Sequence, residues 1–164
     1  MRQSPTTCHR AKVRSAAAAG AAVTVAMLLA VHTLADASPI PSQCFAQASE
    51  RFRLTSPDVL RAIAQQESSG RCIARHPANA DGSYDIGCMG INSSWLPTLQ
   101  KKFGLSEQDL YAPCINVHVG AWIFAKNVRQ YGDSWQALGA YNAKSEYKRI
   151  EYAWKIYKHL SPAR

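Results

Sequence analysis

The sequence has 164 residues, 47% of them hydrophobic and 18% charged, with 19 Lys and Arg against 11 Asp and Glu. This is the length and composition of one globular domain, and the absence of any internal repeat excludes a repeat architecture. The surplus of positive charge favours an anionic polymer as the partner, although a protein that binds nucleic acid has the same signature at this level.

The N-terminal segment, residues 1–37, has the pattern of a signal peptide. Residues 1–14 carry four basic residues and no acid, residues 15–34 are rich in Ala, Val and Leu, and Ala35-Asp36-Ala37 supplies a small-x-small cleavage site. An uncleaved membrane anchor is the alternative, because the apolar stretch approaches the ~20 residues that span a bilayer. Polar residues near its end and the small-residue ending favour removal.

Cleavage would leave a single domain, residues 38–164, with 15 basic and 10 acidic residues and a net charge of +5. We therefore expect export to the periplasm, where nucleic acid is not an available partner. The residues before Cys44 are Pro41-Ser42-Gln43, which do not form a lipoprotein site, so no lipidation is expected there.

A first helix is expected near Cys44–Arg53, and a second begins at Pro57, with Ser56 as its cap. In the second helix an apolar stripe recurs at i, i+3 and i+4, and Glu67 takes the i+7 position of the same face. Burial and the negative end of the helix dipole both disfavour a charged carboxylate there, so they raise its pKa, as a general acid requires. The alternative is a Glu at the helix rim that points to solvent.

The segment from Ala80 to Trp95 is expected to form a small β-hairpin, because an Asp-Gly turn precedes short apolar and polar alternation between glycines. It carries a second acid, Asp85, 18 positions after Glu67. Asp85 either serves chemistry or braces the turn by accepting backbone hydrogen bonds, which is the usual role of a loop Asp. Tyr84 and Trp95, beside the hairpin, are candidates for the lining of a cleft.

The remaining chain is expected to be helical scaffold. A helix entered through Asn92–Ser94 ends at Gly104, and Ser106–Asp109 form a cap. A stripe from Val117 to Tyr131 ends at Gly132, Ser134 caps a short helix, and a last helix follows. We expect the large apolar residues of the last two helices to be core rather than platforms for sugars; they are Trp135, Leu138, Ile150, Trp154 and Tyr157.

Four motifs occur in the order found in the lysozyme-like lytic transglycosylases: Glu67-Ser68-Ser69-Gly70, the segment 81–87, the segment 89–95, and Ala140-Tyr141-Asn142-Ala143. The chain resembles most closely the small group of this family that accompanies bacterial secretion and pilus machines, from about Cys44 to Tyr152. The turn around Asp85 is also similar to the turn of animal-type lysozymes that holds their second catalytic carboxylate. The sequence thus resembles a hybrid of the two.

This resemblance implies an α+β, mainly α, lysozyme-like fold with a small β-hairpin beside the active-site cleft. It implies that Glu67 is the catalytic acid and that Asp85 is a second catalytic carboxylate. The residues it implies for substrate binding are Ser68, Tyr84, Asn92, Tyr141 and Asn142, with Tyr141 bonded to Glu67 or to the sugar. Without the resemblance, Tyr141-Asn142 is equally typical of an ordinary C-terminal helix turn.

Two positions depart from the family pattern, which has Gln where Gly90 stands and Gly where Lys144 stands. Gly90 removes an amide that would line the cleft. Lys144 is expected to alter the loop after Asn142 rather than the chemistry.

Four cysteines, Cys44, Cys72, Cys88 and Cys114, remain after the loss of Cys8, and an even number in an exported small domain indicates disulfides. Three connectivities are open from the residues alone. The resemblance implies Cys44 with Cys114, which leaves Cys72 with Cys88 and would tie the Glu67 helix to the hairpin. Zinc is the alternative, but no C-x-x-C spacing supports it.

We therefore expect an enzyme without metal or cofactor that cleaves the β-1,4 bond between N-acetylmuramic acid and N-acetylglucosamine in peptidoglycan. The expected partners are glycan strands and components of a secretion or pilus machine, and the expected state is a monomer. A non-catalytic wall-binding scaffold subunit is the alternative. Hydrolysis and formation of a 1,6-anhydro product are both compatible with the sequence.

Overall fold

The computed structural model describes residues 39–160. The expected signal peptide, residues 1–37, lies outside this part of the chain and stays a prediction. Within residues 39–160, no helix is both long enough and apolar enough to cross a bilayer.

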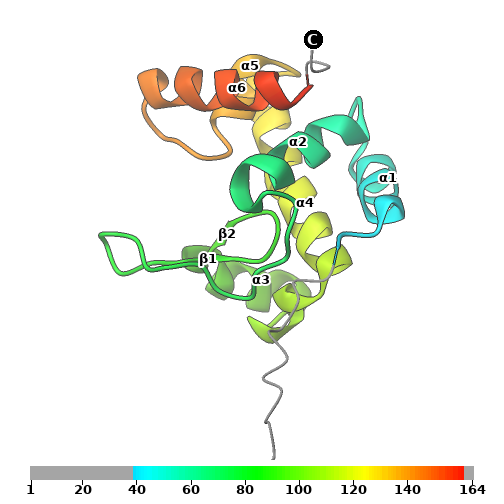
Figure 1. The fold of residues 1–164 in the computed structure, drawn as a ribbon, viewed down its shortest axis with the longest axis vertical. Helices are drawn as coiled ribbons and strands as arrows, with labels where there is room; N and C mark the ends of the chain where they lie inside the picture. Colours follow the sequence, from blue (N-terminus) through cyan, green and yellow to red (C-terminus); the bar gives the residue numbers. More distant parts are fainter. Residues whose placement is uncertain (1–38, 161–164) are drawn as a thin grey trace, which may run out of the picture. The chain divides into compact units, whose positions relative to one another are not determined.

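The described chain is mostly helical, and α4 runs through the middle of the fold with the other helices around it (Figure 1). Helices α1 and α5 pack on α4, and α6 packs on both α5 and α2. The elements are α1 (Ser42–Phe52), α2 (Pro57–Ser68), β1 (Asp85–Ile86), β2 (Ile91–Asn92), the 3-10 turn η1 (Ser93–Trp95), α3 (Leu96–Phe103), the 3-10 turn η2 (Gln108–Tyr111), α4 (Pro113–Tyr131), α5 (Trp135–Gly139) and α6 (Glu146–Leu160). The expected mainly helical fold with one small hairpin is confirmed.

Local sequence signals fix the ends of the helix that carries Glu67. The Ser56 hydroxyl accepts a hydrogen bond from the Asp58 backbone N–H at 3.1 Å, and Pro57 occupies the first turn, where its missing N–H costs nothing. The helix ends where Ser69 turns into the left-handed region at φ 55°, followed by Gly70. Glu67 therefore lies in the last turn.

The hairpin consists of two two-residue strands, in which Asp85 pairs with Asn92 and Ile86 with Ile91. Its turn, residues 87–90, lies over α4 and is bonded to the fully buried Asn116. The Asn116 side chain accepts from the Met89 N–H at 2.8 Å and donates to the Ile86 carbonyl at 3.1 Å. Gly87 is required at this contact, because a Cβ there would lie 2.1 Å from the Asn116 amide. The turn is thus held on the helix by a single buried amide.

Two disulfides join the expected pairs, Cys44 with Cys114 and Cys72 with Cys88. The first ties α1 to the start of α4. The second ties the segment after α2 to the hairpin turn, so the helix that carries Glu67 and the strand that carries Asp85 are linked covalently.

The expectation for the last two helices was partly wrong. Leu138 is buried, but Trp135, Ile150, Trp154 and Tyr157 are 45–60% exposed. Helix α6 has two apolar stripes, and the one that packs inward consists of Tyr152, Ala153 and Ile156. Helical periodicity identifies each stripe but does not show which of them faces the core. The exposed rings pack on one another instead: the ring centroid of Tyr157 lies 5.8 Å from that of Trp135 and 5.5 Å from that of Trp154.

Replacement of Asn116 by Ala should destabilise the protein strongly. The change leaves the Met89 N–H and the Ile86 and Leu110 carbonyls without their buried partner, and an unsatisfied buried group costs about 1–3 kcal/mol. We expect the free energy of unfolding, measured with urea, to fall by about 3 kcal/mol or more.

Asn127 on the same helix is the matched control. Within the described residues its buried amide nitrogen has no hydrogen-bond partner, so Asn127→Ala leaves no partner unsatisfied and should not lower the free energy of unfolding. Equal losses in the two variants would contradict the role given to Asn116.

Candidate active site

Glu67 is held between α6 and the hairpin turn. One carboxyl oxygen, Oε1, accepts a hydrogen bond of 2.5 Å from the Tyr152 hydroxyl. The other oxygen, Oε2, lies against Gly90, so close that a Cβ on that residue would be 2.7 Å away. The carboxyl group therefore has protein on two sides.

Burial raises the pKa of Glu67 above its usual value, because the ionised form loses its hydration. The Tyr152 hydrogen bond opposes this shift, the charge of Asp85 adds to it, and the charges of His76 and Lys155 oppose it. Burial is the largest of these effects, so the carboxyl group keeps its proton to a higher pH than an ordinary Glu. That is the property of a general acid.

Asp85 lies at the start of the hairpin, near enough for its charge to act on Glu67. Its Oδ1 accepts a hydrogen bond of 3.0 Å from the side-chain amide of its cross-strand partner, Asn92. Within residues 39–160, this is the carboxylate's hydrogen bond, and it goes to a side chain rather than to backbone N–H groups of the turn. This bond joins β1 to β2, so it braces the hairpin while it orients the carboxylate, and a catalytic role for Asp85 stays a prediction.

The side-chain amide of Asn92 makes its hydrogen bonds within the protein. Its amide nitrogen also donates to the Ser83 hydroxyl at 3.1 Å, and its oxygen accepts from the Ser94 N–H at 3.0 Å. Asn92 thus orients Asp85 and caps η1.

The hydrogen bond to Glu67 comes from Tyr152 and not from Tyr141. The Tyr141 hydroxyl donates to the Met89 carbonyl at 2.8 Å, and Tyr152 is the residue that bonds Glu67. The two rings stack, with centroids 6.4 Å apart and planes inclined by 18°. Sequence reasoning missed Tyr152, whose signal is its place on the inward stripe of α6, one turn before Ile156.

The other predicted binding residues occupy different surroundings. Ser68 is buried, and its hydroxyl lies 3.0 Å from both the Ala64 and the Cys88 carbonyl oxygens, so it holds the turn to α2. Asn142 is exposed on the loop after α5, where a substrate can reach it. Ser68, which follows Glu67 in the sequence, is therefore buried, whereas Asn142, which follows Tyr141, is exposed.

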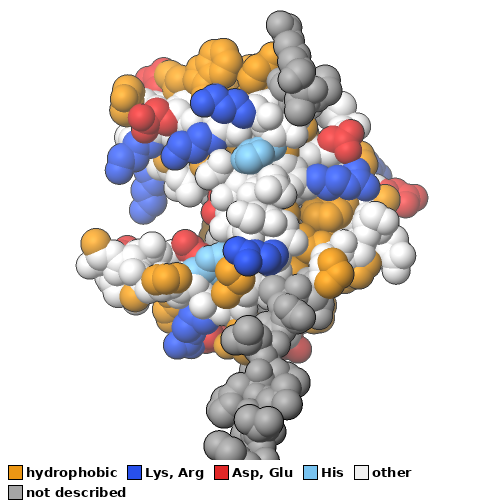
Figure 2. Space-filling model, in the orientation of Figure 1, with side chains coloured by type: hydrophobic (Ala, Val, Ile, Leu, Met, Phe, Trp, Pro, Cys, Tyr) orange, Lys and Arg blue, Asp and Glu red, His pale blue; other side chains and the backbone are white. Residues whose placement is uncertain are grey.

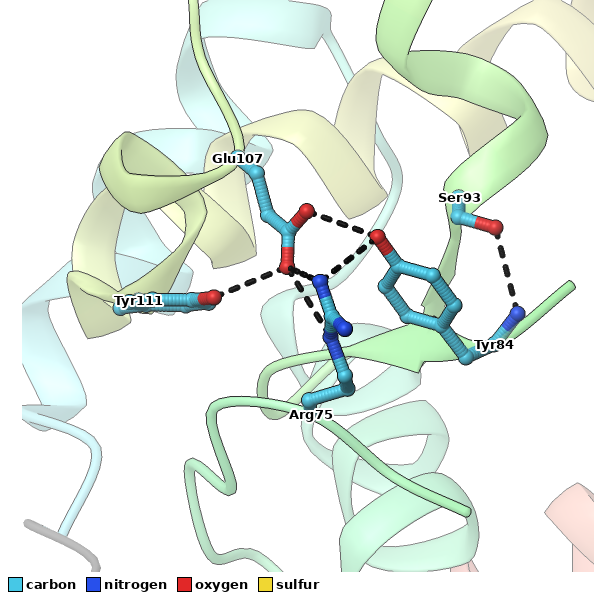
Figure 3. Close-up of polar contacts among 5 residues, drawn as sticks. All are labelled: Arg75, Tyr84, Ser93, Glu107 and Tyr111. Atoms are coloured by element: carbon cyan, nitrogen blue, oxygen red, sulfur yellow. Dashed lines mark hydrogen bonds and ion pairs between the residues drawn. The ribbon is translucent and has the colours of Figure 1, made fainter. Parts of the chain in front are cut away.

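Tyr84 belongs to a polar network that links the hairpin to η2 (Figure 3). Its hydroxyl donates to Glu107 at 2.7 Å and accepts from Arg75 at 2.9 Å, and the Arg75 guanidinium lies 3.9 Å from the ring centroid. Glu107 also accepts from Arg75 and from Tyr111, and the hydrogen bond from Arg75 is the main cause of its lowered pKa. These contacts make Tyr84 a brace of the hairpin. Trp95 likewise packs on Trp122 of α4, 5.5 Å between ring centroids.

The surface is hollowed between the hairpin and the start of α6 (Figures 1 and 2). Figure 2 shows acidic side chains inside this hollow and Lys and Arg side chains along the edge above it. Among residues 39–160, no group of three or more His, Cys, Asp or Glu side chains is placed to hold a metal ion.

Comparison with known proteins agrees with this geometry. Residues 43–153 match the family described as "Transglycosylase SLT domain". The chain is 45% identical over 123 residues to the Invasion protein IagB of Salmonella typhimurium, covering 72% of this chain and 75% of that protein. It is 37% identical over 122 residues to Protein IpgF of Shigella flexneri, covering 71% and 78%.

A solved structure has the same fold: an inactive mutant of the lytic transglycosylase Slt from Pseudomonas aeruginosa, with a TM-score of 0.56 and 19% identity. The match covers 72% of this chain and 23% of that much longer one. At this identity the likeness concerns the fold alone.

The hydrogen bond between Tyr152 and Glu67 can be tested without substrate. It stabilises the charged carboxylate, so Tyr152→Phe should raise the pKa of Glu67 further. The measurement is a pH titration of the Glu67 side-chain carboxyl carbon by NMR.

Tyr157 is the control, because it lies on the exposed stripe of the same helix. Tyr157→Phe should leave the Glu67 titration unchanged. A fall in the pKa of Glu67 in Tyr152→Phe, or no change, would contradict the assigned contact.

Proposed function

This chain belongs to the transglycosylase SLT domain family, and on that premise we propose that it cleaves the β-1,4 bond between N-acetylmuramic acid and N-acetylglucosamine in peptidoglycan. The observation that carries the proposal is the carboxyl group of Glu67, which is held by Tyr152 and the hairpin turn and has a pKa that burial raises. A cell-wall glycan is an elongated anionic polymer, and such a polymer suits the basic edge of the hollow.

In the proposed reaction, Glu67 donates its proton to the glycosidic oxygen as the bond from this oxygen to C1 of N-acetylmuramic acid breaks. Positive charge develops at C1 and the ring oxygen. The carboxylate of Asp85, oriented by Asn92, stabilises this charge. The departing N-acetylglucosamine leaves with the proton as its new hydroxyl hydrogen.

Glu67 is then ionised and acts as a base. It accepts a proton either from water, which attacks C1 and gives hydrolysis, or from the 6-hydroxyl of the same sugar, which closes a 1,6-anhydro ring. The Tyr152 hydroxyl serves this second step, because its hydrogen bond stabilises the carboxylate form. The same contact thus limits how far burial raises the pKa.

The alternative function is a wall-binding scaffold in which Glu67 is only structural. One relative, 37% identical over 126 residues, is the Peptidoglycan-binding-like protein of Escherichia coli O157:H7. A partly buried carboxyl group with a raised pKa costs stability when it ionises, however, and a purely structural site gains nothing from it. The substitution of Glu67 separates the two functions.

We further propose that the protein acts in the periplasm as a monomer and opens the wall locally for a secretion or pilus machine. The proposal rests on the signal-like segment 1–37 and on the Invasion protein IagB as a relative. Nucleic acid is not among the proposed partners.

Glu67→Gln should abolish wall cleavage and leave the fold intact, because the amide keeps the volume but has no acidic proton to donate. Loss of general acid catalysis costs about 10²–10⁴-fold in rate. The measurement is the release of soluble fragments from purified sacculi. A folded Glu67→Gln variant with normal release would remove Glu67 from the mechanism, and wall binding without release by the wild-type protein would favour the scaffold.

Asp85→Asn should slow cleavage by more than about tenfold, since a neutral amide does not stabilise a developing cation in a partly desolvated site. Asp81 is the control: it lies exposed in the same hairpin segment and bonds Ser83. Asp81→Asn should retain the wild-type rate. Equal rates for the two Asn variants would leave Glu67 as the sole catalytic carboxylate.

A further inference from the structure

We infer that Gly90 is a positioning residue: it lets the Glu67 carboxyl group lie directly against the backbone of the hairpin turn. The inference concerns how the acid is held, and its catalytic consequence rests on the function proposed above.

Glu67 occupies the space in which a side chain at position 90 would lie. A Cβ built on its backbone would lie 2.7 Å from Oε2 of Glu67 and 3.2 Å from both Cβ and Cδ of the same side chain. All three nearest atoms belong to Glu67. A side chain at position 90 and the carboxyl group of Glu67 in its present position therefore cannot both occupy this space.

The base of Glu67 is fixed, so a side chain at position 90 would displace the carboxyl end. The backbone of α2 is held to the turn by the Ser68 hydroxyl, which lies 3.0 Å from the Cys88 carbonyl, and by the disulfide between Cys72 and Cys88. The flexible part of Glu67 is its Cγ and carboxyl group. Movement of this group away from position 90 changes its distance to the Tyr152 hydroxyl and opens it to solvent.

The chain supplies a matched control for the backbone effect of such a substitution. Gly90 has a φ of +58°, a conformation that L residues rarely adopt, so any side chain there adds backbone strain. Gly104 has a φ of +69°, and a Cβ on it meets nothing within 4 Å. Both positions have a positive φ, and of the two only Gly90 adds contact with Glu67.

Gly90→Ala and Gly104→Ala should be compared in two measurements. The first is the rate of sacculus cleavage: a misplaced catalytic group costs roughly 10²-fold, so Gly90→Ala should lower kcat by at least about tenfold with KM little changed. The high-pH limb of the pH–rate profile should move to lower pH. Burial is the largest cause of the raised pKa of Glu67, so its loss outweighs a weaker Tyr152 hydrogen bond, which acts in the opposite direction. Gly104→Ala should keep the wild-type rate and pH profile.

The second measurement is the NMR titration of the Glu67 carboxyl carbon, which requires no activity. Gly90→Ala should lower the pKa of Glu67, and Gly104→Ala should not. An unchanged titration in folded Gly90→Ala would overturn the inference. If the wild-type protein does not cleave sacculi, the proposed function fails while the titration still decides the role of Gly90.

A double variant covers the case in which Gly90→Ala does not fold. Truncation of Glu67 to Ala removes Oε2 and Cδ, two of the three atoms nearest to the added methyl group, and leaves only Cβ at 3.2 Å. Glu67→Ala/Gly90→Ala should therefore fold as well as Glu67→Ala/Gly104→Ala. Failure of the first double variant alone to fold would place the clash on other atoms and overturn the inference.

Discussion

The site depends on the position of the hairpin turn, residues 87–90. Four side chains bond the backbone at or beside it: Asn116 from α4, Ser68 from α2, Tyr141 from the loop after α5 and His76 from the segment before the hairpin. The disulfide to Cys72 adds a covalent tie. Two strands of two residues each cannot hold such a turn by themselves, because a short isolated hairpin is only marginally stable in water. The turn is therefore placed by the helices around it.

Once the turn is fixed, the environment of Glu67 follows. The turn closes one side of the carboxyl group, Tyr152 closes another, and the resulting loss of hydration raises its pKa. The pKa of Glu67 is higher in the folded state than in the unfolded state, so Glu67 contributes to stability only at low pH. This contribution is lost as the pH rises through the folded-state pKa. At neutral pH the raised pKa of Glu67 therefore lowers the free energy of unfolding, as expected of a site kept for chemistry rather than for stability.

The sequence predicted the features that local rules control. The cap at Ser56, the stripe that buries one face of α2 and the glycines around the hairpin each have a short-range signal, and the structure contains all three. Tyr152 and the exposed rings of α6 were not predictable in this way, because α6 has two apolar stripes and only its packing on α2 and α5 selects between them. The hydrogen bond from Tyr84 to Glu107 also joins segments that are far apart in the sequence, so the bracing role of Tyr84 became visible only in the fold.

The central claim is that this chain breaks a glycosidic bond of the cell wall through Glu67. The most direct test is mass spectrometry of the fragments that the purified domain releases from sacculi. The account predicts disaccharide-peptides that end in N-acetylmuramic acid, in reducing or 1,6-anhydro form, from the wild-type protein and none from Glu67→Gln. Fragments that arise from cleavage of peptide or amide bonds, or no fragments from the wild-type protein, would contradict it.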